Sequence, residues 1–277
     1  HPRVRRQRQM CIRDSYQTLD GSTLFLGAFF FTIQIYGDFS GYSDIAIGCA
    51  RLFGIDLMQN FKYPYFSRDI AEFWRRWHIS LTTWFRDYIY IPLGGSRAGK
   101  WKSFRNTLVI FLVSGFWHGA NWTFVAWGAY HALLFLPLLL LGQNRRYRDS
   151  VAENSFFPSV KELTQMGVTF LLVLLGWILF RSEDISQAAV YLERMFNASL
   201  FSAPQLVGLG FGQLLLKKCF FFTALMFVVE WIGRKQAHGL MIEDLSLPVR
   251  YVIYTVLLII IYGFDASNPQ GFIYFQF

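Results

Sequence analysis

Long runs of apolar residues constrain this chain more than any other feature of its sequence. Residues 163–180 carry no charged side chain and residues 249–264 carry one. Each run approaches the roughly 20 residues of helix that cross the hydrocarbon layer of a bilayer. The whole chain, with 54% hydrophobic and only 16% charged residues, is too apolar for a water-soluble globular domain. The sequence therefore predicts an all-α, polytopic bundle of transmembrane helices.

Three further apolar stretches extend this bundle. They lie at residues 24–53, 107–141 and 214–232, and the second is long enough for a pair of helices broken near Gly119. Together the stretches predict about six membrane segments. The first stretch is too long for one straight span and contains Gly37, Asp38, Gly41 and Asp44. We therefore expect residues 24–53 to form a broken helix or a tight helical pair whose polar groups face protein.

Residues 1–15 do not share this pattern. They carry five arginines and one aspartate and resemble a translated sequencing-adapter scar, so they are treated as non-native and left out of the fold. No base-stacking or groove-reading module follows their basic run, which argues against nucleic acid as a partner. Residues 16–277 show no internal repeat and no low-complexity linker, and they are expected to form one domain.

Lysine and arginine residues predict the orientation of the bundle. Residues 61–105 carry nine basic and three acidic side chains, and residues 142–162 carry four basic ones. Short basic loops stay on the cytoplasmic side of a membrane, so both segments are expected there. Residues 181–212 hold two basic and three acidic side chains, and residues 265–277 hold no basic one. These two segments are expected on the opposite side.

The segment between Pro64 and Pro92 has a pattern typical of an amphipathic helix. Its aromatic and apolar residues share one helical face: Trp74, Trp77, His78, Leu81, Trp84, Phe85 and Tyr88. Asp69, followed three residues later by Glu72, resembles a capping box at the helix start. A tryptophan-rich face with basic flanks belongs at a membrane interface or partly inserted beside a bundle. We therefore expect an interfacial or re-entrant helix that carries His78 on its apolar side.

His118 is the leading candidate for chemistry. It lies in the sequence SGFWHGAN at residues 114–121, where an ionisable side chain is costly unless it faces a cavity or a partner. An imidazole can accept a hydroxyl proton and later return it. Gly115 and Gly119 are expected to leave room beside the ring for a thioester or a sugar. The alternative, a structural histidine hydrogen-bonded to a carbonyl, stays open from the local sequence.

Other polar residues at membrane depth are secondary candidates. His78 could contribute to a reaction or could only anchor its helix at the interface. His131 is expected to be a buried structural histidine. Asp38, Ser40 and Asp44 could orient a histidine or line a tunnel, or they could form a hydrogen-bonded network at a helix break.

Residues 94–100 resemble a phosphate-binding loop. Their sequence, GGSRAGK, fits the first seven positions of that motif, but Trp101 stands where a Ser or Thr would hold Mg²⁺. We expect a basic cytoplasmic turn that could attract an anionic donor. The cysteines Cys11, Cys49 and Cys219 lack metal-ligand spacing, so no metal site is expected.

Five motifs, in this order along the chain, resemble those of the membrane-bound O-acyltransferase family. They are DFSGYSD at residues 38–44, FWRRWHISL at 73–81, WFRDYIYIPLGG at 84–95, WHG at 117–119 and FIYFQF at 272–277. Within the family, the sequence is most similar to the branch of alginate O-acetyltransferase membrane subunits. The likeness covers nearly all of residues 23–277.

The resemblance implies a helical fold around a central tunnel, in the cytoplasmic (inner) membrane. It implies that an acyl donor such as acetyl-CoA acts as co-substrate, without a bound cofactor, and enters from the cytoplasm. The acyl group then passes to a hydroxyl of an exported polysaccharide or of a periplasmic or extracellular partner protein. The family's two histidines fall on His118 and His78, and the tunnel-lining residues would be Asp38, Ser40, Asp44, Trp77, Trp117, Gly119 and Asn121. Family members have further N-terminal helices, so residues 16–277 are expected to be the C-terminal part of such a domain.

Two functional classes compete at this point. One is an acyltransferase in which His78 and His118 border one tunnel, with His78 towards the cytoplasmic side. The other is a transporter or a non-catalytic scaffold of a polysaccharide export complex, which would also use broken helices and buried carboxylates. The two histidine motifs favour the enzyme. Export that survives replacement of both histidines would favour the scaffold.

Overall fold

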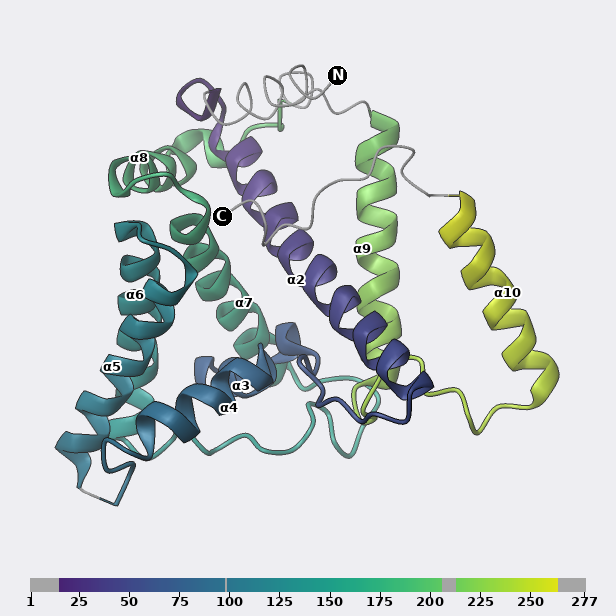
Figure 1. The fold of residues 1–277 in the computed structure, drawn as a ribbon. Coiled ribbons are helices and arrows are strands. Elements are labelled where there is room, and N and C mark those ends of the chain that lie inside the picture. Colours follow the sequence, from purple (N-terminus) through teal and green to yellow (C-terminus); the bar gives the residue numbers. More distant parts are fainter. Residues whose placement is uncertain (1–14, 98, 206–212, 264–277) are drawn as a thin grey trace.

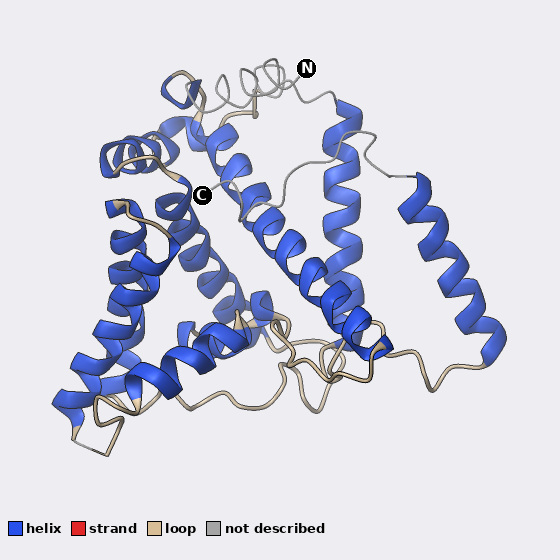
Figure 2. Cartoon of the chain, viewed as in Figure 1, coloured by secondary structure: helices blue, strands red, loops and turns tan. Residues whose placement is uncertain are grey.

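The computed structural model describes residues 15–97, 99–205 and 213–263 (Figure 1). In these ranges the chain forms helices joined by loops and turns, without a strand (Figure 2), which confirms the all-α prediction. The suspected scar, apart from Ser15, and the motif at 272–277 lie outside the described residues. The elements are η1 (Ser15–Gln17), α2 (Gly21–Leu52), η2 (Pro64–Phe66), α3 (Ile70–Arg76), α4 (Ile79–Phe85), η3 (Arg86–Tyr90), α5 (Lys100–His118), α6 (Trp122–Leu140), α7 (Val160–Arg181), α8 (Ile185–Met195), η4 (Ala198–Phe201), α9 (Gln213–Gly233) and α10 (Leu247–Gly263).

Helix α2 is one continuous helix of 32 residues, so the predicted break in residues 24–53 is wrong. At 1.5 Å per residue, it is about 48 Å long. Glycines in a helix interior cost only about 1 kcal/mol each relative to alanine. The polar residues Asp38 and Asp44 occupy exposed positions, while the opposite side buries Ile35, Tyr36 and Phe39. Packing of this apolar side keeps the helix continuous.

Helices α5 and α6 form a hairpin that breaks where Gly119 predicted it. α5 ends at His118, and α6 begins after Asn121, whose side-chain oxygen accepts a hydrogen bond of 3.1 Å from the Thr123 backbone N–H. An asparagine in this position satisfies a backbone donor that the first turn of a helix leaves unpaired. The predicted pair of helices at 107–141 is therefore confirmed.

Glycines bring α5 and α6 into direct backbone contact. A Cβ atom at Gly115 would lie 2.3 Å from the Phe124 carbonyl oxygen, and one at Gly128 would lie 2.2 Å from the Phe111 carbonyl oxygen. A Cβ atom at Gly119 would lie 2.7 Å from the Phe124 ring. The expectation that Gly115 and Gly119 leave room for a substrate is therefore wrong, because Phe124 fills both spaces. Small residues serve here to pack one helix against another.

Two helices are long and apolar enough to cross a membrane by length and composition. They are α6, with 19 residues, and α7, with 22 residues, and α10 is a shorter apolar helix. Helices also form at the other predicted stretches, as α2, α5 and α9. Their crossing of a membrane, and the count of about six spans, stay predictions.

An aromatic core lies between α2, α3, α6 and α7. It buries Tyr36, Phe39, Phe61, Tyr65, Phe73, Trp77, Phe124, Trp127, Trp177 and Phe180. α9 contacts the periphery of this core through Met226 and Phe227. Phe227 and Trp231 also pack on Phe66, which belongs to a smaller separate cluster. α10 has no buried residue and lies at one side of the molecule (Figure 1).

Helix α8 was not anticipated from the sequence. It is amphipathic and packs on the start of α2, where Met195 is fully buried and the Tyr191 hydroxyl donates a hydrogen bond of 2.7 Å to the Leu24 carbonyl. A search for long apolar runs does not detect such a helix, since only one of its faces is apolar.

The tryptophan-rich segment is broken, so the prediction of one helix between Pro64 and Pro92 is wrong. α3 ends at Arg76, α4 starts at Ile79, and a π-helical turn follows at Arg86–Tyr90. The break occurs at His78, whose φ of 44° lies in the left-handed region. The side chain of Asp69 caps α3, accepting from the Glu72 N–H at 2.7 Å, as predicted. Glu72 instead accepts from the Arg68 N–H, so the second half of the capping box is absent.

The two basic segments meet at one end of the molecule, the lower end in Figure 1. The Arg75 guanidinium donates hydrogen bonds of 2.5 Å to the carbonyls of Asn144 and Tyr147. The loop between α6 and α7 therefore lies against α3. This agrees with the expectation that residues 61–105 and 142–162 share one side of the membrane.

Candidate functional site

The two candidate histidines line one small cavity, called here the histidine chamber. Its walls come from α3, α4, α5, α6 and α7: Trp74, Trp77, His78, Leu81, Thr82, Phe85, Ser114, His118, Trp127 and Trp177. The chamber offers about 20 Å³ to the centre of a water-sized molecule. That is room for about one water or one small polar group. Forty positions of sequence separate the histidines, and the fold brings them together.

Aromatic rings surround His118 at the end of α5. Its ring centroid lies 5.1 Å from Trp117, 5.3 Å from Trp127 and 5.0 Å from Phe180, with the rings close to perpendicular. Edge-to-face packing of this kind holds the imidazole in a fixed plane. The aromatic surroundings also exclude water from most of the ring, which strengthens any hydrogen bond made inside the chamber.

His78 occupies an unusual backbone conformation. A left-handed φ at a residue other than glycine costs about 1–3 kcal/mol and persists only where surrounding contacts enforce it. The ring packs edge-on against Phe39, with centroids 4.7 Å apart, and lies 6.5 Å from Phe61. This backbone turn ends one short helix and starts the next. It also places the imidazole between the aromatic core and the chamber.

Asn60 contacts His78 and was not a candidate from the sequence. Its side-chain oxygen lies 3.3 Å from His78 Nδ1, 2.7 Å from the Ser80 hydroxyl and 3.2 Å from the Ser80 backbone nitrogen. The Asn60 carbonyl also accepts from the Ile79 N–H at 2.9 Å. Asn60 lies in the segment between α2 and η2, eighteen positions before His78. No local periodicity connects such a residue to the site.

Buried nitrogen donors surround the chamber. The indole N–H groups of Trp74, Trp127 and Trp177 have no hydrogen-bond partner among the described residues. An unpaired buried donor costs about 1–3 kcal/mol, which a polar guest in reach would offset. The arrangement can therefore hold a small polar or partly charged group between two imidazoles.

The other predicted site residues fall into three groups. Trp77 lines the chamber beside His78. Trp117, Gly119 and Asn121 belong to the α5–α6 connection, where the Asn121 amide also donates a bond of 2.6 Å to the Glu183 carbonyl. Their role in a tunnel stays a prediction.

The third group belongs to α2 and faces a different cavity. Ser40 and Asp44 line a cleft of about 590 Å³ between α2, α9 and the loop after α9. Asp38 lies on an exposed side of α2. A layer formed by Tyr36, Phe39 and Phe61 separates this cleft from His78.

A partly buried carboxylate lies in the wall of the cleft. Glu230 of α9 accepts a short hydrogen bond from the Tyr36 hydroxyl. The loop after α9 closes over the cleft, where Gln59 donates to the Ala237 carbonyl and His238 lies 4.0 Å from Asp44. The cleft and the histidine chamber are separate spaces. A continuous central tunnel is therefore left as a prediction.

His131 is buried, as expected, and neither of its ring nitrogens has a hydrogen-bond partner among the described residues. Its structural role stays a prediction. The side chain is fully buried between α3, α6 and α7, and it packs against Trp74, Trp127 and Tyr130 at centroid distances of 5.0–5.3 Å. A Cβ atom at Gly176 would lie 2.7 Å from its Nε2 atom, so α7 approaches the ring closely. The residue is placed by packing on every side.

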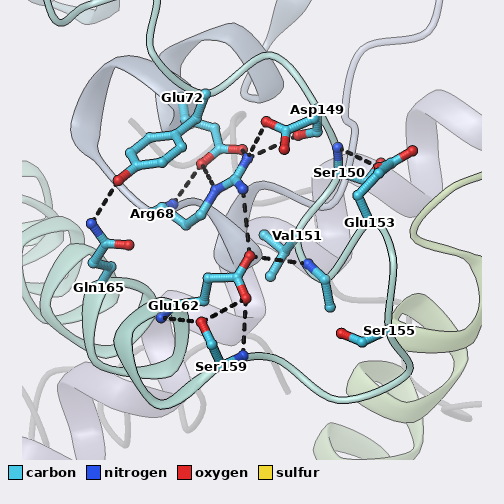
Figure 3. A network of polar contacts seen from close by, with 12 residues as sticks. Arg68, Glu72, Asp149, Ser150, Val151, Glu153, Ser155, Ser159, Glu162 and Gln165 are labelled. Carbon is cyan, nitrogen blue, oxygen red and sulfur yellow. Dashed lines mark hydrogen bonds and ion pairs between the residues drawn. The ribbon is translucent and has the colours of Figure 1, made fainter.

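A buried ion cluster anchors the other end of α3 (Figure 3). The Arg68 guanidinium donates two bonds to Glu72, of 3.0 and 3.1 Å, and the two side chains are 4% and 1% exposed. It also reaches Asp149, at 3.0 Å, and Glu162 of α7, at 3.6 Å. Partial burial raises the pKa of Asp149, but hydrogen bonds from Arg68 outweigh it and leave that pKa below its ordinary value.

The described residues 94–97, 99 and 100 do not form a phosphate-binding loop of the P-loop type. That motif follows a β-strand, whereas the residues before it form the π-helical turn Arg86–Tyr90. Gly94 and Gly95 lie in the turn that follows and have positive φ values. The expectation of a turn that precedes α5 is confirmed for the described residues.

Comparison with known proteins agrees with the motifs around the two histidines. The family model of the membrane-bound O-acyltransferases matches residues 12–148, which include both histidines and most of the chamber. The chain belongs to the membrane-bound O-acyltransferase family. It is 43% identical over 196 residues to a Pseudomonas aeruginosa protein named "Probable alginate O-acetylase AlgI", which covers 69% of this chain and 36% of that protein.

Other members of the family are also similar. A peptidoglycan O-acetyltransferase of Helicobacter pylori is 40% identical over 165 residues, covering 60% of this chain and 30% of that protein. A teichoic acid D-alanyltransferase of Streptococcus thermophilus is 38% identical over 163 residues, covering 53% of this chain and 38% of that protein. The chain thus spans about a third of the length of the curated relatives that it matches.

Proposed function

We propose that the protein is an O-acyltransferase that moves an acetyl group from a cytoplasmic donor to a hydroxyl group on the far side of the membrane. The observation that carries the proposal is the histidine chamber. Two imidazoles from separate family motifs line one water-poor cavity. A transporter or scaffold would not require two titratable rings to share such a small space.

In this proposal His118 is the general base. An imidazole nitrogen of His118 accepts the proton of the acceptor hydroxyl, and the oxygen attacks the carbonyl carbon of the donor thioester. The C–S bond then breaks, and the sulfur leaves as a thiol after receiving the proton from His118. His78 places the donor thioester or assists the hand-over of the acyl group. Orienting the thioester carbonyl and the acceptor hydroxyl against the two imidazoles supplies much of the rate gain.

The substrates follow from the chemistry and from the named relatives. The donor is a thioester such as acetyl-CoA, used as a co-substrate, and no bound cofactor takes part. The acceptor is a hydroxyl of an exported polysaccharide or of a periplasmic or extracellular partner protein with acetyltransferase activity. Relatives named for alginate, peptidoglycan and teichoic acid support an acceptor in the cell envelope. The protein would then be a multi-pass protein of the inner membrane, in contact with lipid.

Acetyl analysis of the exported polysaccharide tests the proposal. Cells with the intact gene, cells without it, and cells with both His78 and His118 replaced by alanine are compared at equal protein level. We expect acetate release from the polymer to disappear in the last two. Full acetylation in the double variant would favour the scaffold alternative. Loss of the polymer itself would favour a transporter.

The orientation can be tested separately. We expect the basic turn before α5 to face the cytoplasm, because residues 61–105 carry nine basic residues against three acidic ones. A cysteine in place of Ser96 should react in intact cells only with a membrane-permeant thiol reagent. Efficient reaction with an impermeant reagent in sealed cells would reverse the orientation.

A further inference from the structure

We propose that Asn60 is a positioning residue that sets the tautomer and the protonation behaviour of the His78 imidazole. The importance of this for catalysis rests on the proposed function. The contact itself can be tested without it. Asn60 approaches Nδ1 of the ring from the segment between α2 and η2, on the side where Ser80 lies in the first turn of α4.

The orientation of the Asn60 amide follows from its neighbours. Nitrogen and oxygen of an amide are assigned from hydrogen bonds, not seen directly. The Ser80 backbone nitrogen can only donate, and it lies 3.2 Å from the atom that faces it. That atom must therefore be the Asn60 oxygen. The amide nitrogen then lies 3.4 Å from the hydroxyl of Ser43, which is buried on α2.

The tautomer of His78 follows from the same oxygen. His78 Nδ1 lies 3.3 Å from it, and an amide oxygen can only accept. The Ser80 hydroxyl already donates to this oxygen at 2.7 Å. A neutral His78 is therefore protonated on Nδ1, and its Nε2 atom carries the lone pair. Nε2 is the nitrogen left to act on a proton or a polar group in the chamber.

Asn60 also enforces the backbone turn at His78. Its carbonyl accepts from Ile79 N–H, and its side-chain oxygen accepts from Ser80 N–H, the second residue of α4. One residue thus caps α4 in place of the missing side-chain cap of His78. A purely structural role would end there. The additional contact with Nδ1 couples the same residue to the ring.

Carbethoxylation measures this coupling without relying on catalysis. Diethyl pyrocarbonate modifies only an unprotonated imidazole nitrogen, so the rate at His78, followed by mass spectrometry against pH, reports its protonation. In Asn60→Asp of the full-length protein, the acceptor oxygen and the cap remain, but a carboxylate now faces Nδ1. A carboxylate favours the imidazolium. The midpoint, that is, the pH at which His78 reacts at half its maximal rate, should therefore rise by about one pH unit or more. The acid limb of the kcat profile should move the same way.

Asn60→Ala provides the second measurement. Without the oxygen, Nδ1 keeps only a long contact of 3.4 Å with the Ser80 hydroxyl, and His78 should give double adducts where the parent protein gives single ones. Misplacement of the ring should lower kcat by about 10- to 100-fold. Asp69→Ala is the matched control, because it removes the corresponding cap from α3 without touching His78. It should lower the melting temperature while leaving the midpoint and the adduct pattern unchanged.

The outcomes separate the two proposals. A midpoint in Asn60→Asp that coincides with the parent value, together with single adducts in Asn60→Ala, would overturn the positioning role. A shifted midpoint in a protein whose His78→Ala variant retains full acyl transfer would keep the positioning role. It would also remove His78 from the chemistry that the proposed function assigns to it.

Discussion

The two ends of α3 are built in opposite ways. At its start, Arg68 and Glu72 form a buried ion pair. Arg68 also pairs with the loop before α7 and with α7, so the ion cluster ties both to the start of α3. Just after its end, His78 enters a chamber of aromatic rings. The cluster has its charges matched, whereas the chamber keeps indole donors unpaired among the described residues. The stabilising ion pairs and the residue proposed to take part in the reaction thus lie at opposite ends of α3, a helix of seven residues.

The largest expected effect lies in the chamber. His118→Ala in the full-length protein should lower acyl transfer by 10²- to 10⁴-fold, about 3–5 kcal/mol of activation free energy, because a general base is lost. The membrane level and the melting temperature should stay close to those of the parent protein. Product acetylation and immunoblots of membranes give both readouts. Near-normal acetylation in a well-expressed variant would show that His118 is not the base.

Breaking the ion cluster should lower the free energy of unfolding by a comparable amount. Glu72→Ala leaves the guanidiniums of Arg68 and Arg76 without their shared carboxylate. Loss of one partner from a buried pair costs about 3–5 kcal/mol. Thermal unfolding in detergent should show the loss, while transfer per folded molecule at low temperature should change little. A variant with parental stability and poor transfer would contradict the division between the two ends of α3.

The contact between α5 and α6 should give an intermediate effect. Gly128→Ala forces a Cβ atom against the Phe111 carbonyl, and Gly115→Ala does the same against the Phe124 carbonyl. Overpacking of this kind costs about 1–3 kcal/mol for each variant. Gly115 is one turn from His118, so only its substitution should also lower kcat. Equal kcat losses in both variants would mean that the chamber does not depend on the local position of α5.

The smallest effect is expected at Asp149, whose side chain is 55% exposed. Its lowered pKa gives stability above the ordinary carboxyl pKa of about 3.9, and this stability is lost as the pH falls through the folded-state value. Asp149→Asn should therefore destabilise the protein by no more than about 0.5 kcal/mol at neutral pH. Melting temperatures at pH 7 and at a pH well below about 3.9 should differ less in the variant than in the parent. A larger loss would place Asp149 inside the buried cluster.

Local patterns predicted the parts of the fold that depend on neighbouring residues. Gly119 marked the end of α5, and Asp69 marked the cap of α3. The apolar runs marked α6 and α7. Caps and runs of this kind act within a few residues, so the sequence displays them directly.

Non-local contacts account for what the sequence did not predict. The aromatic periodicity continues through Trp74, Trp77 and Leu81, so it does not show that His78 leaves the helix. The continuity of α2 depends on packing of its buried side. Its glycines and aspartates indicated a break instead, because a local reading of the sequence does not include that packing. The hydrogen bond between Asn60 and His78 joins residues eighteen positions apart, and no helical or strand periodicity predicts it.

The left-handed backbone of His78 has a consequence for natural and laboratory variation at this position. Glycine tolerates positive φ values freely, and asparagine and aspartate tolerate them better than most residues do. A saturation library at position 78, sorted first for protein abundance, should therefore enrich these three substitutions over larger, branched ones. If His78 takes part in the reaction, all three would be abundant and inactive. Abundance and activity would then give different rankings of the same twenty residues, and sequence logos built from either alone would misstate what this position requires.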